Sequence, residues 1–158
     1  MTIVPDASFG VVPLQYREKG WWLLVVQHRQ GHWSLPKGHP NPGETPHTTA
    51  CRELFEETRC RVLRFLDFPS MAENYQFRVE KRQIQKTVTY FVAEAAGEPS
   101  PQLEELKAAV WLPIREAEQR VTFDQCRRMC QRVGQFVHGK QPNQLPGLPH
   151  LKVAPWTS

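Results

Sequence analysis

The chain has 158 residues, of which 40% are hydrophobic and 23% charged, and these proportions fit one globular domain rather than a disordered, collagen-like or coiled-coil protein. Lys and Arg number 20 against 16 Asp and Glu, and the net charge of +4 favours an anionic substrate or a weak affinity for nucleic acid. No apolar run approaches the roughly 20 residues of a membrane-spanning helix, and the opening residues show no secretory signal. We therefore expect a cytoplasmic protein with no membrane partner and with reduced structural thiols at Cys126 and Cys130.

The first half of the chain predicts a hairpin and a helix. Residues 8–16 and 21–28 are apolar and β-branched, and the turn-like sequence REKG between them predicts two antiparallel strands. A loop rich in proline and glycine follows. A helix is expected from Pro46, a residue that the first turn of a helix tolerates, to about Thr58.

The second half predicts three strands, over residues 60–69, 85–95 and 108–113. Apolar residues then recur at helical spacing from Phe123 to Val137. The element order is ββαβββαα, so the fold class is α+β. We expect one domain over residues 1–138, followed by a proline-rich tail over 139–158 that is extended or disordered.

Three carboxylates are expected on one face of the helix that begins near Pro46. On a helical wheel, Glu56 and Glu57 lie within about 60° of Glu53. The like charges of Glu53 and Glu57, four residues apart, cost about 0.2–0.5 kcal/mol on an isolated helix. Clustered carboxylates are what a hard cation such as Mg²⁺ takes, together with substrate phosphates. The spacing therefore favours a metal site over the alternative, a solvated acidic face.

Residues 38–60, GHPNPGETPHTTACRELFEETRC, resemble the Nudix box, Gly-x5-Glu-x7-Arg-Glu-apolar-x-Glu-Glu-x-Gly-apolar. Arg59 stands where the family usually has glycine, and Cys60 takes the final apolar position. The glycine normally serves as a left-handed C-cap, a conformation that costs another residue about 1 kcal/mol or more. The departure thus predicts local strain rather than lost chemistry. The positions that match the motif are Gly38, Glu44, Arg52, Glu53, Leu54, Glu56 and Glu57.

The resemblance implies a Nudix α/β/α sandwich, with a mixed β-sheet and the catalytic loop-helix-loop, over about residues 6–138. It also implies hydrolysis of a nucleoside diphosphate linked to another group, with Mg²⁺ or Mn²⁺ as the cofactor. By motif position, Arg52 would orient the carboxylates and Glu44 would support the loop. The implied metal ligands, which together with Arg52 form the implied catalytic set, are Glu53, Glu56, Glu57 and Glu105.

Glu105 enters this set because similar hydrolases place a glutamate at its offset, six residues before Trp111. A carboxylate there reaches the metal site from a loop and can act as the general base. Its immediate neighbour Glu104 is the alternative candidate for this downstream acid. A further alternative is that Glu105 is a solvated loop residue with no part in the reaction.

The stretches HWSLPKGHPNPGE and KTVTYFVAE resemble diadenosine tetraphosphate hydrolases. The resemblance makes Lys37 and Lys86 candidate phosphate contacts and Gly38 part of the substrate loop. His32 is a candidate hydrogen-bond partner of the substrate, and Tyr90 is a candidate stacking partner for a base. The structural alternatives are two surface lysines, a solvated histidine and a tyrosine that packs within the sheet.

We therefore expect a metal-dependent hydrolase of dinucleoside polyphosphates that cleaves diadenosine tetraphosphate to ATP and AMP. The first alternative is an RNA 5′-pyrophosphohydrolase acting on an RNA 5′ end, because bacterial members share a similar loop and box and an RNA chain suits the positive charge. A hydrolase of oxidised nucleotides and a non-catalytic nucleotide-binding module are less favoured. The intact Arg-Glu-x-x-Glu-Glu set argues against the last of these, and the sequence favours no particular oligomeric state.

Overall fold

The computed structural model describes residues 2–151 and 153. Helix α1 begins and ends at the predicted residues, and α3 begins one residue later than expected. The two-residue strands β3 and β4, the longer strand β6 and the helix α2 were not predicted individually. In chain order the elements are β1 (Thr2–Arg17), β2 (Gly20–His28), β3 (Trp33–Ser34), β4 (Lys37–Gly38), α1 (Pro46–Thr58), β5 (Arg61–Phe65), β6 (Met71–Val79), β7 (Arg82–Ala96), β8 (Leu106–Pro113), α2 (Ile114–Arg120), α3 (Asp124–Val137) and the 3₁₀ turn η1 (Pro142–Gln144).

The strands of the described residues form one mixed sheet. Its central path runs β3-β2-β1-β7-β5, while β4 pairs with β1, β6 with β7 and β8 with β2. Strands β1 and β7 are parallel over their whole paired length, and β1 and β2 form the predicted antiparallel hairpin. The sheet thus places β4, which carries the start of the box, directly against β1.

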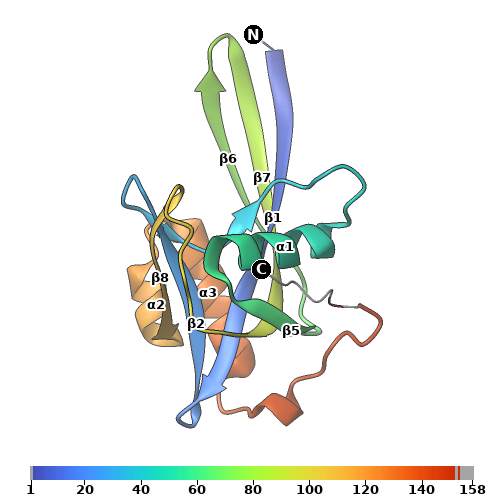
Figure 1. Cartoon of the computed structure of the whole chain (residues 1–158), viewed down its shortest axis with the longest axis vertical. Coiled ribbons are helices and arrows are strands. Elements are labelled where there is room, and N and C mark those ends of the chain that lie inside the picture. Colours follow the sequence, from blue (N-terminus) through green and yellow to red (C-terminus); the bar gives the residue numbers. More distant parts are fainter. Residues whose placement is uncertain (1, 152, 154–158) are drawn as a thin grey trace.

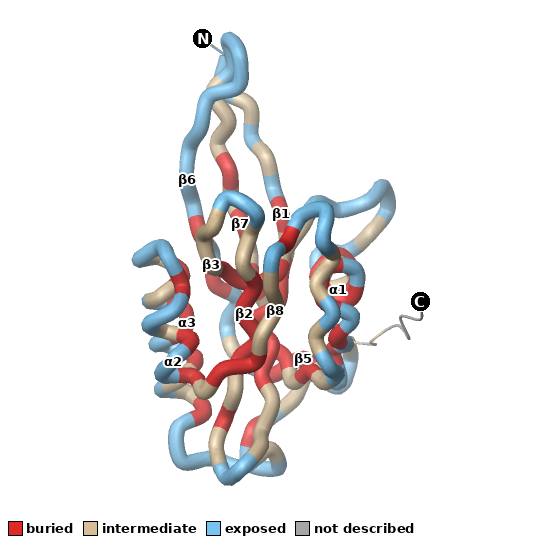
Figure 2. Tube along the Cα trace, turned by 60° about the vertical axis from the view of Figure 1, so that its left-hand side comes forward, coloured by how far each residue is buried: buried red, intermediate tan, exposed pale blue. Residues whose placement is uncertain are grey.

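Helices cover both faces of the sheet, as Figure 2 shows. On one face, Ala50, Cys51 and Leu54 of α1 pack in a cluster with side chains of β1, β2, β5 and β8. On the other face, α2 and α3 pack on alternate residues of β1, β2 and β7. This arrangement confirms the α+β Nudix fold.

Strands β1, β6 and β7 extend beyond the helices as a three-stranded arm (Figure 1). Only Met71 and Glu73 of β6 are buried, although Met71, Tyr75, Phe77 and Val79 follow the two-residue period of a strand. The arm instead exposes several large apolar side chains, namely Ile3, Tyr75, Phe77 and Val79.

The described part of the tail, for which an extended or disordered segment is expected, packs against the domain. Gly147 forms a β-bridge with Leu66, and Leu145 is buried in the core. Arg64 on β5 donates hydrogen bonds to the carbonyls of Leu145, at 2.9 Å, and Pro142, at 2.8 Å. These contacts attach residues 142–147 beside β5, an outer strand of the sheet. The end of the tail, residue 152 and residues 154–158, lies outside the described residues.

Cys126 and Cys130 are buried thiols on α3, as predicted. Trp111 is buried in the cluster under α1. Among the described residues, no helix combines the length and the apolar character needed to cross a membrane.

Candidate active site

Helix α1 is fixed at both ends by local contacts. The Thr45 side chain accepts a hydrogen bond from the Thr48 N–H at 3.2 Å, which caps the helix start. At the other end Arg59 adopts the left-handed conformation, with φ of 64°, and its N–H bonds to the Phe55 carbonyl at 2.8 Å. The predicted strained C-cap is therefore confirmed. The Arg59 guanidinium lies 4.9 Å from the centre of the Phe55 ring, a contact that offsets part of the strain.

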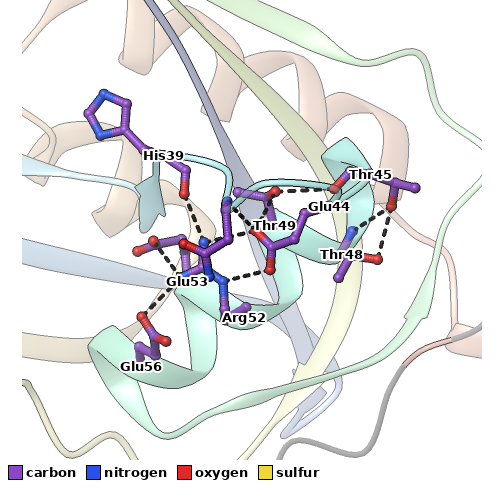
Figure 3. A network of polar contacts seen from close by, with 9 residues as sticks. His39, Glu44, Thr45, Thr48, Thr49, Arg52, Glu53 and Glu56 are labelled. Carbon is purple, nitrogen blue, oxygen red and sulfur yellow. Dashed lines mark hydrogen bonds and ion pairs between the residues drawn. The ribbon is translucent and has the colours of Figure 1, made fainter.

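Arg52 connects the box carboxylates on the polar side of α1 (Figure 3). Its Nη1 donates to Glu53 Oε1 at 2.8 Å and to Glu56 Oε2 at 3.0 Å. Its Nε and Nη2 donate to the two oxygens of Glu44, at 2.7 and 3.0 Å, and Nη2 also reaches the His39 carbonyl at 2.7 Å. These contacts match the orienting role implied for Arg52.

Glu44 joins the loop before α1 to the helix itself. Its Oε1 accepts hydrogen bonds from the Asn41 N–H at 2.7 Å and the Thr49 hydroxyl at 3.0 Å. The hydrogen bonds from Arg52 are the main reason that the pKa of Glu44 is lowered to about 2. Glu44 is therefore an ionised carboxylate that holds the loop, as its motif position implied.

Gly38 makes room for the Glu53 carboxylate. A Cβ at position 38 would overlap the carboxyl carbon and both carboxylate oxygens of Glu53. Only glycine lets β4 approach α1 this closely. The structure thus gives Gly38 a role in placing a candidate metal ligand.

Glu57 is the most deeply buried of the box carboxylates, with 4% exposure. Its Oε2 accepts a hydrogen bond from the Lys37 N–H at 3.4 Å, whereas Oε1 meets no hydrogen-bond donor among the described residues. Burial, followed by the charges of Glu53 and Glu105, raises the pKa of Glu57 to about 8. A buried carboxylate near two others is strongly favoured to bind a cation or a proton.

Glu105 approaches these carboxylates from the loop between β7 and β8. The Gln102 N–H donates to the Glu57 carbonyl at 2.9 Å, and the Ser100 N–H donates to the Thr58 carbonyl at 2.8 Å, so the loop is attached to the end of α1. Burial, together with the charges of Glu56 and Glu105, raises the pKa of Glu53 against the opposing effect of Arg52. This influence favours Glu105 over Glu104 as the downstream acid.

The carboxylates fit a divalent metal in their chemistry, because hard oxygen ligands suit Mg²⁺ and Mn²⁺. The bare oxygen of Glu57 and the mutual repulsion of Glu53, Glu57 and Glu105 are what a bound cation would relieve. Within residues 2–151 and 153, however, no three His, Cys, Asp or Glu side chains are yet arranged around one point as metal ligands. Arg52 pairs with one oxygen of Glu53 and with one of Glu56.

The prediction that Lys86 contacts a phosphate requires a free ammonium, and the structure does not provide one. The side chain is buried and its Nζ lies 2.7 Å from Asp6 Oδ2 and 2.6 Å from Ser8 Oγ. The Nε2 of His39 lies 3.0 Å from the same atom. Because these neighbours occupy the ammonium, Lys86 anchors the arm rather than a phosphate.

Tyr90 is not placed for stacking on a base, and this prediction is also wrong. Its side chain is fully buried, since it occupies the inward-facing side of β7 under α3. Burial and the nearby Glu73 carboxylate raise the pKa of Tyr90. Packing within the sheet, the structural alternative for this residue, is what the structure shows.

His32 lies in an aromatic group that the sequence did not reveal. Its ring stacks on His28, with centroids 4.2 Å apart, and lies 5.7 Å from the ring of Phe123. Burial and the charge of Lys37 lower the pKa of His32, so its ring is neutral at neutral pH. Phe123 was read as part of the apolar face of α3, but it is the N-cap residue and is 54% exposed.

Comparisons with known proteins agree with this architecture. The model of the NUDIX domain family matches residues 4–129. MutT4 of Mycobacterium tuberculosis is 37% identical over 123 residues, which are 74% of this chain and 48% of that protein, so the chain spans about half of this relative. The asymmetrical bis(5′-nucleosyl)-tetraphosphatase of Rattus norvegicus is 32% identical over 119 residues, covering 73% of this chain and 80% of the rat protein.

Solved structures show the same fold. A Caenorhabditis elegans Ap4A hydrolase in a binary complex aligns with a TM-score of 0.65 and 20% identity, covering 85% of this chain and 98% of that one. The NUDIX domain of Shewanella oneidensis NrtR, complexed with ADP ribose, aligns with a TM-score of 0.65 and 16% identity over 85% of this chain and 89% of that one. At such identities the similarity establishes the arrangement of the strands and helices only.

Proposed function

The chain belongs to the Nudix family of pyrophosphohydrolases, and on this premise we propose that it is a divalent-metal-dependent hydrolase of dinucleoside polyphosphates, above all diadenosine tetraphosphate. The observation that carries the proposal is the buried Glu57 carboxylate, whose Oε1 meets no donor among the described residues. Its neighbours include the charges of Glu53 and Glu105. Such a set is stable only when a cation or proton neutralises it.

The residues that would hold Mg²⁺ or Mn²⁺ are the carboxylates of Glu53, Glu56, Glu57 and Glu105. When bound, the metal stabilises negative charge on the phosphoryl oxygens and favours ionisation of the attacking water. Arg52 fixes one oxygen of Glu53 and one of Glu56, so these side chains are held before substrate arrives. These ion pairs orient the two carboxylates, which would still have to converge on one point to hold the metal.

Glu105 is the proposed general base. It stands on a loop that two backbone hydrogen bonds attach to the carboxyl end of α1, so its position relative to Glu57 is fixed. A carboxylate within hydrogen-bond reach of the attacking water accepts its proton as the phosphorus–oxygen bond forms. The Lys37 ammonium, which lies among the same carboxylates, supplies the positive charge for the substrate phosphates.

The dinucleoside substrate is supported by the name of the rat relative and by the aromatic pair of His32 and Phe123, because His32 lies close enough to Lys37 for its charge to lower the pKa of the ring. The neutral ring of His32 and the exposed ring of Phe123 offer a surface on which a base can stack. We assign to His32 and Phe123 the stacking on a base that was predicted for Tyr90. A substrate with two bases gains more from such a surface than one with a single base.

A second candidate is the hydrolysis of oxidised nucleoside triphosphates. It is favoured by an 8-oxo-(d)GTP phosphatase of Mycolicibacterium smegmatis, which is 30% identical over 114 residues. That relative is longer, because the match covers only 32% of it, and the match spans 69% of this chain.

The test is a substrate panel with purified protein and Mg²⁺. Diadenosine tetraphosphate, triphosphorylated RNA, GTP and 8-oxo-GTP are ranked by kcat/KM, with the Glu57→Gln variant as the control for contaminating phosphatases. The proposal expects diadenosine tetraphosphate to rank first and to yield ATP and AMP in equal amounts. A ranking led by RNA or by 8-oxo-GTP transfers the assignment to that substrate, and activity that persists in Glu57→Gln contradicts the proposed site.

A further inference from the structure

The protruding arm ends at strand β6, which pairs only with β7 among the described residues (Figure 1). The side chain of Gln125 on α3 covers the outer edge of β6 at one residue. It accepts a hydrogen bond from the Asn74 N–H at 3.0 Å and donates one to the Asn74 carbonyl at 2.9 Å. Both main-chain polar groups of Asn74 therefore point away from β7.

The alternation of an antiparallel ladder extends this direction along β6. Val79 and Arg82 flank a two-residue turn, so this pair and every second pair after it exchange hydrogen bonds between β6 and β7. The N–H and C=O groups of Gln76 and Arg78 consequently point outward, like those of Asn74. They meet no main-chain partner among the described residues.

An apolar row crosses the arm and ends at this open edge. Val4 of β1 is opposite Ile84 of β7, and Ile84 is opposite Phe77 of β6. Residues paired in this way project from the same face of a sheet. Tyr75 and Val79 flank Phe77 on that face, and each of these three side chains is 41–42% exposed.

The edge of β6 lacks the protection that edge strands usually have. The outer edge of β1 is interrupted by Pro5, which has no N–H. Residues 75–79 of β6 contain no proline, and their pairing with β7 continues without a bulge. The single charge among them, Arg78, projects from the face opposite to Phe77. This segment is therefore open to the addition of another strand.

We propose that a second copy of this chain covers this edge, with the two β6 strands paired antiparallel about a two-fold axis at Phe77. In this register Gln76 of each copy exchanges two main-chain hydrogen bonds with Arg78 of the other. Phe77 faces Phe77 of the second copy, and Tyr75 meets Val79. The apolar row then continues through both arms.

The neighbouring registers that also oppose outward-pointing groups are less favourable. An axis at Arg78 would place two guanidinium groups directly opposite each other. An axis at Gln76 would require the main-chain groups of Asn74, which Gln125 already engages. The axis at Phe77 avoids both conflicts.

Charge and area set the strength of this pair. With the axis at Phe77, the turn residue Lys81 comes opposite Glu73 of the second copy, and the two cationic turns lie at opposite ends. A stable dimer buries about 800 Å² on each partner. Three side chains that are 41–42% exposed supply only part of this area, so we expect a weak dimer that forms at high concentration.

Sedimentation velocity over a concentration series tests whether the dimer forms. For a dissociation constant on the order of 50 µM, wild-type protein should be mostly monomeric at about 5 µM and mostly dimeric at about 500 µM. Phe77→Lys should remain monomeric at about 500 µM. Ile3→Lys is the matched control, because Ile3 is an exposed residue on the opposite face of the arm, and it should dimerise like wild type.

Disulfide trapping tests the register. The Cα atoms of a directly opposed pair without hydrogen bonds lie about 4.5 Å apart, which a disulfide can span. Phe77→Cys should therefore form a covalent dimer with oxidised glutathione as the oxidant. Arg78→Cys should form little, because its two copies lie diagonally, roughly 7–8 Å apart. The four native cysteines are buried, so they should not compete.

Wild-type protein that stays monomeric at about 500 µM overturns the proposal and leaves the edge to a different partner. A dimer that persists in Phe77→Lys, or equal trapping of Phe77→Cys and Arg78→Cys, also overturns it, because the contact then lies elsewhere. Should Phe77→Lys not fold, the trapping experiment decides. These measurements use neither metal nor nucleotide, so their outcome is independent of the proposed hydrolysis.

Discussion

The guanidinium of Arg52 donates two hydrogen bonds to the Glu44 carboxylate, from Nε to Oε2 at 2.7 Å and from Nη2 to Oε1 at 3.0 Å. This bidentate pair fixes the plane of the guanidinium. The remaining Nη1 then reaches Glu53 and Glu56. Glu44 thus controls the orientation of two candidate metal ligands that it does not itself contact.

Glu44→Gln should destabilise the protein by about 1.5–3 kcal/mol at neutral pH, because it removes a charged hydrogen-bond partner of Arg52. The pKa of Glu44 is about 2 in the folded protein, below its ordinary value of 4.5, which we take for the unfolded chain. Its contribution is therefore complete above about pH 4.5 and is lost as the pH falls toward 2. The urea midpoints of wild type and Glu44→Gln are compared at pH 7 and pH 3. A difference between the two proteins that is as large at pH 3 as at pH 7 contradicts the role of the ionised carboxylate. Glu80→Gln serves as the surface control.

Glu57→Gln should lower kcat/KM by about 100-fold or more without loss of folding, because it removes a metal-site charge and keeps the shape. The pKa of Glu57 is raised from 4.5 to about 8, so its ionisation destabilises the folded state as pH rises through that window. Metal-free Glu57→Gln should therefore be at least as stable as wild type at pH 8. Added Mg²⁺ should raise the melting temperature of wild type only. Near-native turnover by the variant would exclude the assigned role.

The residues whose roles depend on local sequence were the predictable ones. The bounds of α1 follow from Pro46 and the apolar spacing, and the contact of Arg52 with Glu56 follows from their separation by one helical turn. The left-handed Arg59 was predictable because the motif places a C-cap there. Each of these features involves residues close together in the chain.

The residues whose roles depend on the packing of distant strands were not predictable. Lys86 meets Asp6 and Ser8 because β1 and β7 are parallel neighbours, which no local pattern indicates. Phe123 belongs to the apolar pattern of α3 but stands at its exposed N-cap, where it meets His32. The carboxylate of Glu73 becomes buried only because β6 joins the same sheet.

Gly38→Ala should reduce kcat/KM by on the order of tenfold to 100-fold, because its Cβ overlaps the Glu53 carboxylate and must displace it. Gly20→Ala is the matched control. A Cβ at Gly20 meets nothing within 4 Å among the described residues, so this variant should keep wild-type activity. Equal activity of the two variants would show that the Glu53 carboxylate tolerates the shift.

Arg59→Gly and Arg59→Ala should differ in stability. Both variants lose the contact with Phe55, but glycine relieves the left-handed strain at φ of 64° whereas alanine keeps it. The glycine variant should exceed the alanine variant by about 1–2 kcal/mol in urea unfolding. Because neither change reaches the carboxylates, kcat/KM should stay within about twofold of wild type. Equal stability of the two variants would mean that the helix end relaxes to another conformation.

Lys86→Met should act on stability rather than on substrate binding. It leaves Asp6 and Ser8 without the ammonium that they contact at 2.7 and 2.6 Å, which should lower the free energy of unfolding by about 1–3 kcal/mol. Asp6→Asn combined with Lys86→Met removes the unpaired charge as well, so the double variant should recover part of this stability. Under conditions where both variants are fully folded, kcat/KM for diadenosine tetraphosphate should fall by less than about threefold. A direct phosphate contact by Lys86 would instead predict a loss of roughly tenfold, about 1.4 kcal/mol. A tenfold loss that persists in the double variant would return Lys86 to the substrate site, because the arm would then be intact and only the phosphate contact would be missing.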